Sequence, residues 1–318
     1  MSPSALIKNP VGSAIPLLFA LLLTACTGAP VAEAVQPDPA TPAAVHTPAN
    51  PTAAPAQAVD SRPAATPTPT PGPDDWKDAP VIPAISENAL AIYQRGLELG
   101  NDPHVFSKLG DCETFTTWFL TPFDQQPQTY DLGPYAELEA VITYYAGSFA
   151  RPSMAARPGF NASSVFAPLW ADPERCEVGE TPIECEFRLN QPSLVLIMFG
   201  TNDLWHQEEF ETQMRRMIEF SIEAGVVPIL STKADNLEGD DSINRTIYAL
   251  ALEYDIPLWN FWGALQDLPR QGLDTDGAHL TFAANRFGDA QALQAAWPVR
   301  NLTALQVLEA FRTAADIP

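Results

Sequence analysis

Positive charge is scarce in this chain of 318 residues. Lysine and arginine together number 17, against 39 aspartate and glutamate residues, so the formal net charge is −22. A surface this acidic repels the phosphates of nucleic acids. The composition therefore excludes a protein whose task is to bind DNA or RNA.

Side chains that hold transition metals are also few, with four histidines and four cysteines in the whole chain. The cysteines beyond residue 100 lie apart in the sequence and no histidines cluster, so the sequence predicts no zinc site. The acidic residues Glu238, Asp240 and Asp241 lack the ligand spacing of a calcium loop and are interpreted as a solvated turn. We therefore expect neither a metal nor a cofactor.

A long apolar run is present only near the N-terminus and is short for a membrane span. Lys8 precedes the run Ala14–Ala25, which has the length of the apolar region of a signal peptide. It ends in Leu23-Thr24-Ala25-Cys26, which resembles a bacterial lipobox. We expect residues 1–26 to be a lipoprotein signal and Cys26 to be lipidated, which anchors the protein to a membrane. A plain cleaved signal peptide and a retained transmembrane anchor are the alternatives.

Proline is abundant and unevenly placed. Of 32 prolines, twelve lie between Pro30 and Pro73, in a stretch that is also rich in alanine and threonine. Such a stretch buries too little apolar surface to offset the loss of chain entropy on folding. We expect residues 27–79 to form a disordered tether and residues 80–318 to form the folded domain.

The remaining cysteines indicate an oxidising compartment. Cys176 and Cys185 close a short loop, and a disulfide between them is typical of exported proteins. That pairing leaves Cys112 as a free thiol. It is either an inert buried cysteine or a residue with a chemical role.

Strand-like and helix-like segments alternate beyond residue 80. Continuous apolar runs predict strands that are covered on both faces, and periodic apolar spacing predicts helices. This alternation is typical of a three-layer α/β/α sandwich with a doubly wound, mostly parallel sheet. The predicted strands are 104–109, 194–199, 226–231 and 257–261, and the predicted helices are 87–99, 135–145, 208–224, 243–254, 283–297 and 302–315. Residues 149–190 are expected to be an irregular loop stapled by the disulfide.

Polar residues follow three of these segments, at the edge where such a sheet binds ligands. They are Gly110-Asp111-Cys112, Gly200-Thr201-Asn202-Asp203 and Asp276-Gly277-Ala278-His279. In order and approximate spacing these blocks resemble those of the GDSL/SGNH hydrolase family, over roughly residues 80–318. The resemblance implies a flavodoxin-like SGNH hydrolase fold, with cysteine at the position of the family's nucleophilic serine.

The resemblance also implies roles for individual residues. Cys112 is the nucleophile, His279 the base that takes its proton, and Asp276 the residue that orients the imidazole. Asn202 and the backbone N–H groups of Cys112 and Gly147 form the oxyanion hole. The start of a helix and the nearby His279 are expected to favour the thiolate of Cys112.

These observations together predict an extracytoplasmic hydrolase of carboxylic esters. Its substrate would be a small-molecule or glycan ester, and it would lie at the cell surface or the periplasmic face after secretion across the bacterial inner membrane. One alternative is a catalytically lapsed module that binds a surface ligand on the same fold. Another is a thioesterase or acyltransferase that uses the same residues.

Overall fold

The computed structural model describes residues 72, 74–125 and 127–317. The expected signal peptide at residues 1–26, the lipidation site Cys26 and the expected tether up to residue 71 lie outside these residues. None of the helices in the described part is both long enough and apolar enough to cross a bilayer.

Four parallel strands form the central sheet, in the order β1-β3-β4-β5. Their bounds are β1 Asp102–Gly110, β3 Pro192–Met198, β4 Val227–Ser231 and β5 Leu258–Trp259. Gly110 also makes an isolated parallel bridge to Ala156. Since the other edge of Gly110 pairs with Met198 of β3, the segment around Ala156 lies on the outer side of β1. The chain thus runs in both directions from β1, and the expected doubly wound topology is confirmed.

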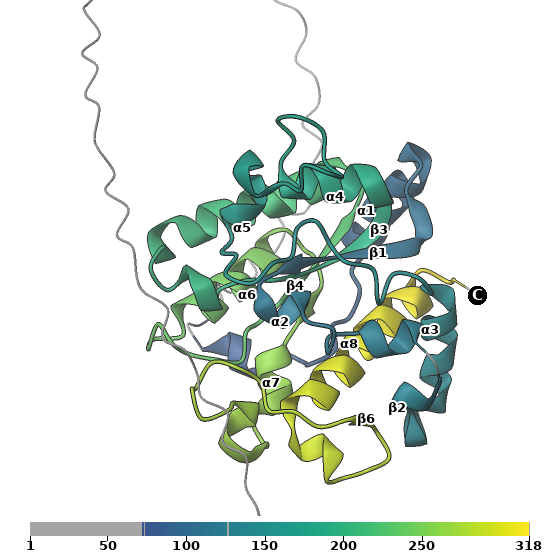
Figure 1. The fold of residues 1–318 in the computed structure, drawn as a ribbon, viewed down its shortest axis with the longest axis vertical. Helices are drawn as coiled ribbons and strands as arrows, with labels where there is room; N and C mark the ends of the chain where they lie inside the picture. The colour runs from purple at the N-terminus through teal and green to yellow at the C-terminus, as the bar shows by residue number, and fades with distance from the viewer. Residues whose placement is uncertain (1–71, 73, 126, 318) are drawn as a thin grey trace, which may run out of the picture. The chain divides into compact units, whose positions relative to one another are not determined.

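Helices cover both faces of this sheet, with α4 and α5 on one side and α7 and α8 on the other (Figure 1). The helices are α1 Glu87–Leu99, α2 Cys112–Phe115, α3 Glu139–Tyr144, α4 Pro182–Asn190, α5 Gln207–Glu223, α6 Ser242–Glu253, α7 Phe261–Leu265 and α8 Ala296–Ala314. Every residue of β3 and of β4 is buried. The continuous apolar runs of the sequence therefore became strands that are covered on both faces, and the expected three layers are confirmed.

Residues 283–297 differ from the expected helix. They contain the two-residue strand β6 Asn285–Arg286, which pairs in parallel with β2 Tyr130–Asp131, and α8 begins only at Ala296. Pro298 lies in the first turn of α8, where its missing N–H has no helical partner to lose. The proline therefore marks the start of a helix where periodicity alone placed the end of one.

Residues 149–190 form the expected irregular segment only in part. The disulfide between Cys176 and Cys185 is confirmed, but Cys185 lies in helix α4. Thr181 caps α4 and forms a capping box with Glu184, and Pro182 occupies the first helical position. This Thr-Pro-x-Glu pattern is a helix-start signal that the sequence analysis missed.

The folded part begins earlier than the expected boundary at residue 80. A short 3₁₀ helix, η1 Asp75–Asp78, places Trp76 in the core, where its ring lies 4.6 Å from that of Trp262. The Asn260 amide donates hydrogen bonds to the carbonyl groups of Trp76 and Ala79. Residues 74–79 thus belong to the folded domain and not to the tether.

Candidate active site

Strand β1 delivers Cys112 to the carboxyl edge of the sheet. The strand ends at Gly110, the Asp111 side chain accepts a hydrogen bond from the Glu113 N–H, and Cys112 is the first residue of α2. A Cβ atom at Gly110 would lie 2.2 Å from Thr114 Oγ1 and 2.7 Å from the Met198 carbonyl oxygen. Glycine is therefore required for the tight turn that leads from the strand into the helix.

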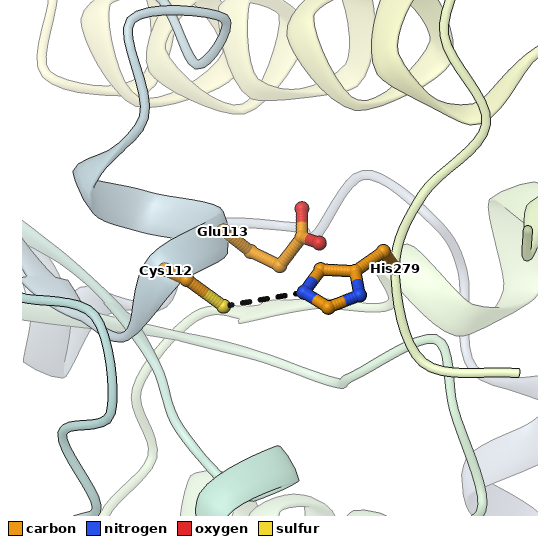
Figure 2. A group of neighbouring side chains, drawn as sticks. All are labelled: Cys112, Glu113 and His279. Carbon is orange, nitrogen blue, oxygen red and sulfur yellow. Dashed lines mark hydrogen bonds between the residues drawn. The ribbon is translucent and has the colours of Figure 1, made fainter. Parts of the chain in front are cut away.

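Two of the expected blocks meet at this edge (Figure 2). Cys112 Sγ lies 3.9 Å from His279 Nε2, and His279 Nδ1 lies 2.6 Å from Asp276 Oδ2. Asp276 Oδ1 also accepts hydrogen bonds from the N–H groups of Ala278 and His279. The imidazole thus lies between a thiol and a carboxylate, although the two segments are 167 residues apart in the sequence.

The carboxylate and the imidazole stabilise each other's charged forms. The hydrogen bond from His279 holds the pKa of Asp276 well below its usual value, and the same bond raises the pKa of His279. The side chains of His279 and Asp276 are 60% and 50% exposed, so solvent screens much of this attraction. The geometry fixes the tautomer with hydrogen on Nδ1 and leaves Nε2 to face the sulfur.

The thiol is less acidic than the sequence analysis expected. Burial raises the pKa of Cys112 to about 11, and the negative charges of Asp111 and Glu113 add to this rise. These effects act against the thiolate that the helix start and His279 are expected to favour. At neutral pH the sulfur carries its proton, and any attack by it requires a base.

The rate at which iodoacetamide alkylates Cys112 should report this raised pKa. Raising a thiol pKa from 9.0 to about 11 lowers the thiolate fraction at neutral pH about a hundred-fold. The greater nucleophilicity of a more basic thiolate recovers about tenfold of this loss. We expect alkylation at pH 7 about tenfold slower than for an exposed cysteine in a peptide, and a rate that keeps rising up to about pH 11. A plateau near pH 8, measured by mass spectrometry of the Cys112 peptide, would contradict this prediction.

Glu113, the residue after Cys112, forms an ion pair with Arg300 that no sequence pattern indicated. Arg300 is fully buried in α8, its guanidinium lies 4.1 Å from the centre of the Phe119 ring, and it donates to the Glu113 carbonyl oxygen. Arg300 Nη1 also lies 3.7 Å from Glu113 Oε2, and Glu113 Oε1 accepts from the Leu280 N–H. Glu113 therefore links α2 to the loop that carries His279.

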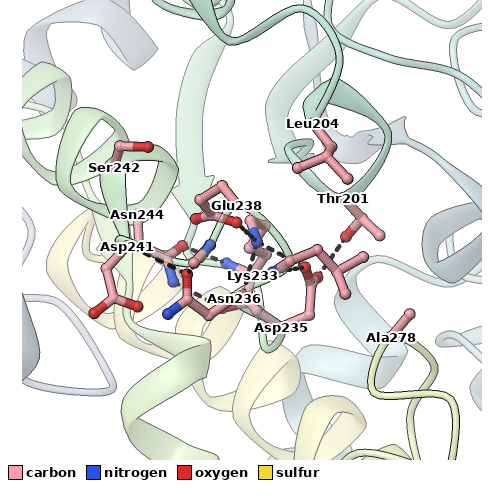
Figure 3. Close-up of polar contacts among 12 residues, drawn as sticks. Thr201, Leu204, Lys233, Asp235, Asn236, Glu238, Asp241, Ser242, Asn244 and Ala278 are labelled. Atoms are coloured by element: carbon pink, nitrogen blue, oxygen red, sulfur yellow. Dashed lines mark hydrogen bonds and ion pairs between the residues drawn. The ribbon is translucent and has the colours of Figure 1, made fainter.

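Asn202 lies in the 3₁₀ helix η7 Thr201–Asp203, directly after β3. Its Nδ2 donates to the Phe160 carbonyl oxygen at 3.0 Å. The neighbouring Thr201 hydroxyl donates to Asp235 Oδ2 at 2.7 Å, which ties η7 to the loop after β4 (Figure 3). This places the Asn202 amide beside the segment that follows the Ala156 bridge.

A buried cluster of charged side chains lies beside η7. Lys233 Nζ lies 2.7 Å from Asp235 Oδ1 and 2.7 Å from Glu238 Oε2, and all three side chains are at most 2% exposed (Figure 3). The interpretation of the acidic stretch as a solvated turn was thus wrong for Glu238. Lysine and acidic residues in a polar stretch give no sequence signal that separates a buried cluster from a surface loop.

Gly147 is the glycine that the resemblance implied as an oxyanion donor. Its N–H donates to Asp124 Oδ1 at 2.7 Å, so this donor already has a partner. The segment beside Gly110 is instead 155–157, where the Arg157 N–H donates to the Gly110 carbonyl oxygen. The next glycine along this segment is Gly159, which has a φ of 81° and open space where a Cβ would be. Gly159 precedes Phe160, the residue bound by Asn202, and replaces Gly147 as the candidate donor.

A cavity of about 460 Å³ adjoins α2 on this side. Its lining includes Phe115 from α2, Ala156 and Arg157 from the segment beside β1, and the half-exposed Trp170. Aromatic walls with a few polar groups are typical of sites for small organic ligands. Phe115 is the residue of α2 that lines the cavity, and neither Cys112 nor His279 lines it.

Comparison with known proteins gives similarities to solved structures only. No protein-family model matches the sequence, and no curated protein matches it. A GDSL-like lipase from Bacteroides thetaiotaomicron is 15% identical, with a TM-score of 0.39 over 69% of this chain and 98% of that one. An acetylxylan esterase from Geobacillus stearothermophilus is 15% identical, with a TM-score of 0.40 over 66% and 94%. A putative lipolytic protein of the G-D-S-L family from Desulfitobacterium hafniense is 13% identical, with a TM-score of 0.39 over 64% and 99%. Nothing about the chemistry of this chain follows from likenesses at this level.

Proposed function

We propose that this protein hydrolyses carboxylic esters through an acyl intermediate on Cys112. The observation that carries the proposal is the alignment of thiol, imidazole and carboxylate, with 3.9 Å from Cys112 Sγ to His279 Nε2 and 2.6 Å from His279 Nδ1 to Asp276. A nucleophile beside a base that a third group orients is the arrangement that acyl transfer requires.

In the first half of the reaction, Cys112 Sγ attacks the ester carbonyl carbon and His279 Nε2 takes the thiol proton. The tetrahedral intermediate collapses to a thioester on Cys112, and His279 returns the proton to the departing alkoxide, which leaves as an alcohol. In the second half, His279 deprotonates a water molecule that attacks the thioester, and the acid and the free thiol are released. Asp276 stabilises the imidazolium that forms in each half.

Because the pKa of the Cys112 thiol is raised to about 11, proton transfer to His279 accompanies the attack. This differs from cysteine hydrolases that hold a preformed thiolate–imidazolium pair. The developing oxyanion would be held by the Asn202 side-chain amide and by the backbone N–H groups of Cys112 and Gly159. Donors that point at this oxygen before reaction are commonly the largest single contribution to acyl-transfer rates.

Asn202→Ala should lower kcat for p-nitrophenyl acetate by about 10²- to 10³-fold, because it removes one oxyanion donor. Steady-state kinetics on the purified protein measures this. Asn190→Ala is the matched control, since the Asn190 amide donates to the Glu186 carbonyl oxygen within α4. Equal loss in the two variants would remove Asn202 from the proposed site.

The substrate we propose is a small-molecule or glycan ester, since the cavity beside α2 exposes the rings of Phe115 and Trp170, on which a sugar ring can stack. A thioesterase or acyltransferase would use the same residues, and a binding module would use the cavity alone. Turnover of p-nitrophenyl acetate, compared with an acetyl thioester and with an acetylated oligosaccharide, separates these functions. Faster turnover of the thioester by the same enzyme would assign thioester hydrolysis instead.

We also propose that the protein is exported and held at a membrane by lipid on Cys26. The lipobox-like sequence and the disulfide between Cys176 and Cys185 support this, because disulfides persist in oxidising compartments. Cys26→Ser should move the protein from the membrane fraction to the soluble fraction of cells that process bacterial lipoproteins. Wild-type protein that incorporates no labelled fatty acid in these cells would contradict the lipid anchor.

A further inference from the structure

We propose that Cys112, Glu113 and His279 form a binding site for a borderline-soft divalent metal ion such as Zn²⁺, and that the bound ion blocks the nucleophile. The sulfur, a carboxylate oxygen of Glu113 and a ring nitrogen of His279 all lie within 4.8 Å of one another (Figure 2). The blocking effect rests on the proposed ester hydrolysis, whereas the binding of the ion does not.

The donor set suits this class of metal ion. Zn²⁺ in proteins is held by cysteine sulfur, histidine nitrogen and carboxylate oxygen, and three such ligands with one open position are typical of accessible zinc sites. With a Zn–S bond of about 2.3 Å and a Zn–N bond of about 2.0 Å, tetrahedral geometry separates the two ligand atoms by about 3.5 Å. The 3.9 Å between Cys112 Sγ and His279 Nε2 is therefore close to the separation that the ion needs.

The contacts behind His279 prepare the ring for a metal. Its Nδ1 is hydrogen-bonded to Asp276 Oδ2 at 2.6 Å, which leaves the Nε2 lone pair directed at the sulfur. Metal-binding histidines almost always make such a bond to a carboxylate or a carbonyl group through their other nitrogen. The 60% exposure of the His279 side chain also gives a metal ion access from solvent.

One carboxylate oxygen of Glu113 lacks a hydrogen-bond partner. This oxygen, Oε2, is buried and accepts no hydrogen bond, and Arg300 Nη1 lies 3.7 Å from it. A buried carboxylate oxygen without a hydrogen-bond donor is costly, so the Glu113 carboxylate gains from a second cation in addition to Arg300. Asp111 and Glu113 flank the sulfur with acidic groups, which attract a divalent cation to the same place.

Cysteine at position 112 is what makes the site. A serine hydroxyl is a poor ligand for Zn²⁺, so the residue that departs from the hydrolase pattern is also the one that adds the soft donor. The second group of this kind in the described residues is Cys176, Glu180 and Cys185. Its two sulfurs are joined in a disulfide, and its carboxylate is paired with Arg188, so it offers no thiolate.

When the ion binds, it displaces the thiol proton to solvent and uses the electron pairs of both Sγ and Nε2. Neither the nucleophile nor its base can then take part in ester hydrolysis. No oxidation or reduction occurs. A chelator removes the ion and restores both groups. The proposed hydrolase would therefore be inhibited reversibly by free Zn²⁺ outside the cytoplasm.

Cobalt(II) titration of the full chain, expressed without a polyhistidine tag and freed of metal by chelation, tests the site. We expect a thiolate-to-cobalt charge-transfer band that saturates at one equivalent and disappears in Cys112→Ser. Asp276→Asn should weaken binding about 10- to 100-fold, which is the usual effect of losing the carboxylate behind a ligating histidine. Glu113→Gln and His279→Asn should weaken it at least as much. Cys26→Ser and Glu208→Gln, a change at an exposed glutamate of α5, should leave the titration unchanged.

A wild-type protein without the band, or a band that survives Cys112→Ser, would overturn the proposal. Wild-type affinity in Glu113→Gln would overturn the three-ligand site. If Glu113→Gln melts well below the wild type, its weaker binding does not separate a lost ligand from lost folding. The metal affinity of His279→Asn then tests the site, because the exposed His279 side chain can be changed without loss of packing. A cobalt band in a protein that turns over no ester would support the metal site and contradict the proposed hydrolysis. Ester turnover in a protein that shows no cobalt band would support the proposed hydrolysis and contradict the metal site.

Discussion

Cys112→Ala should lower ester turnover by about 10⁴-fold or more, because it removes the atom that forms the acyl intermediate. The Asn202 amide, the backbone donors and the cavity beside α2 remain in this variant, so a residual rate above that of water is expected. End-point assays with p-nitrophenyl acetate measure the loss. The enzyme concentration must be high enough to detect this residual rate. If the wild type and Cys112→Ala behaved alike on every substrate tried, the nucleophile assignment would be wrong.

Cys112→Ser provides the matched comparison, and we expect it to remain active. The raised pKa of the thiol means that His279 must remove a proton during attack, which is the same requirement that a serine hydroxyl has. The shorter C–O bond moves the reacting atom away from the position that sulfur occupies, and a misplacement of about 1 Å costs about a hundred-fold. We therefore expect the serine variant to lie within about a hundred-fold of the wild type. A serine variant as inactive as Cys112→Ala would indicate a mechanism that depends on a thiolate.

The sequence predicts the sheet well, because burial on both faces leaves a plain pattern. Residues 194–199 are apolar without interruption, and residues 194–198 lie in β3, which is buried throughout. The pattern also predicts Cys112 at the carboxyl edge, because its block directly follows β1, whereas α7 lies between β5 and the block of His279. Helix 283–297 was mispredicted because local periodicity does not include the pairing of β6 with β2, which lies far away in the chain.

The electrostatics of the site could not be predicted in the same way. The pKa of Cys112 depends first on burial, and burial is set by how α2 packs against β1 and α8. Gly147 is predicted because it follows a predicted helix, whereas the bridge between Gly110 and Ala156 is the contact on which we propose the later glycine, Gly159, instead. Both outcomes depend on contacts between distant segments, which no local pattern contains.

Lys233→Met should destabilise the folded domain by about 3–5 kcal/mol, which is the usual cost of removing one partner of a buried ion pair. The Lys233 ammonium group compensates both Asp235 and Glu238, and all three side chains are at most 2% exposed. Without the lysine, two buried carboxylates lie close together with no cation between them. For a domain of this size, such a loss lowers the melting temperature by about 6–20 °C.

Differential scanning calorimetry of the wild type and the variant measures this shift, with the exposed Glu208→Gln as the control. The triple variant Lys233→Met/Asp235→Asn/Glu238→Gln should recover a large part of the lost stability, because no uncompensated charge remains in the interior. The Thr201 hydroxyl can still donate to the side-chain oxygen of an asparagine at position 235, so η7 and Asn202 should keep their place. Ester turnover in the triple variant should then exceed that in Lys233→Met at the same temperature. A Lys233→Met protein that melts with the wild type would show that the cluster contributes nothing to stability.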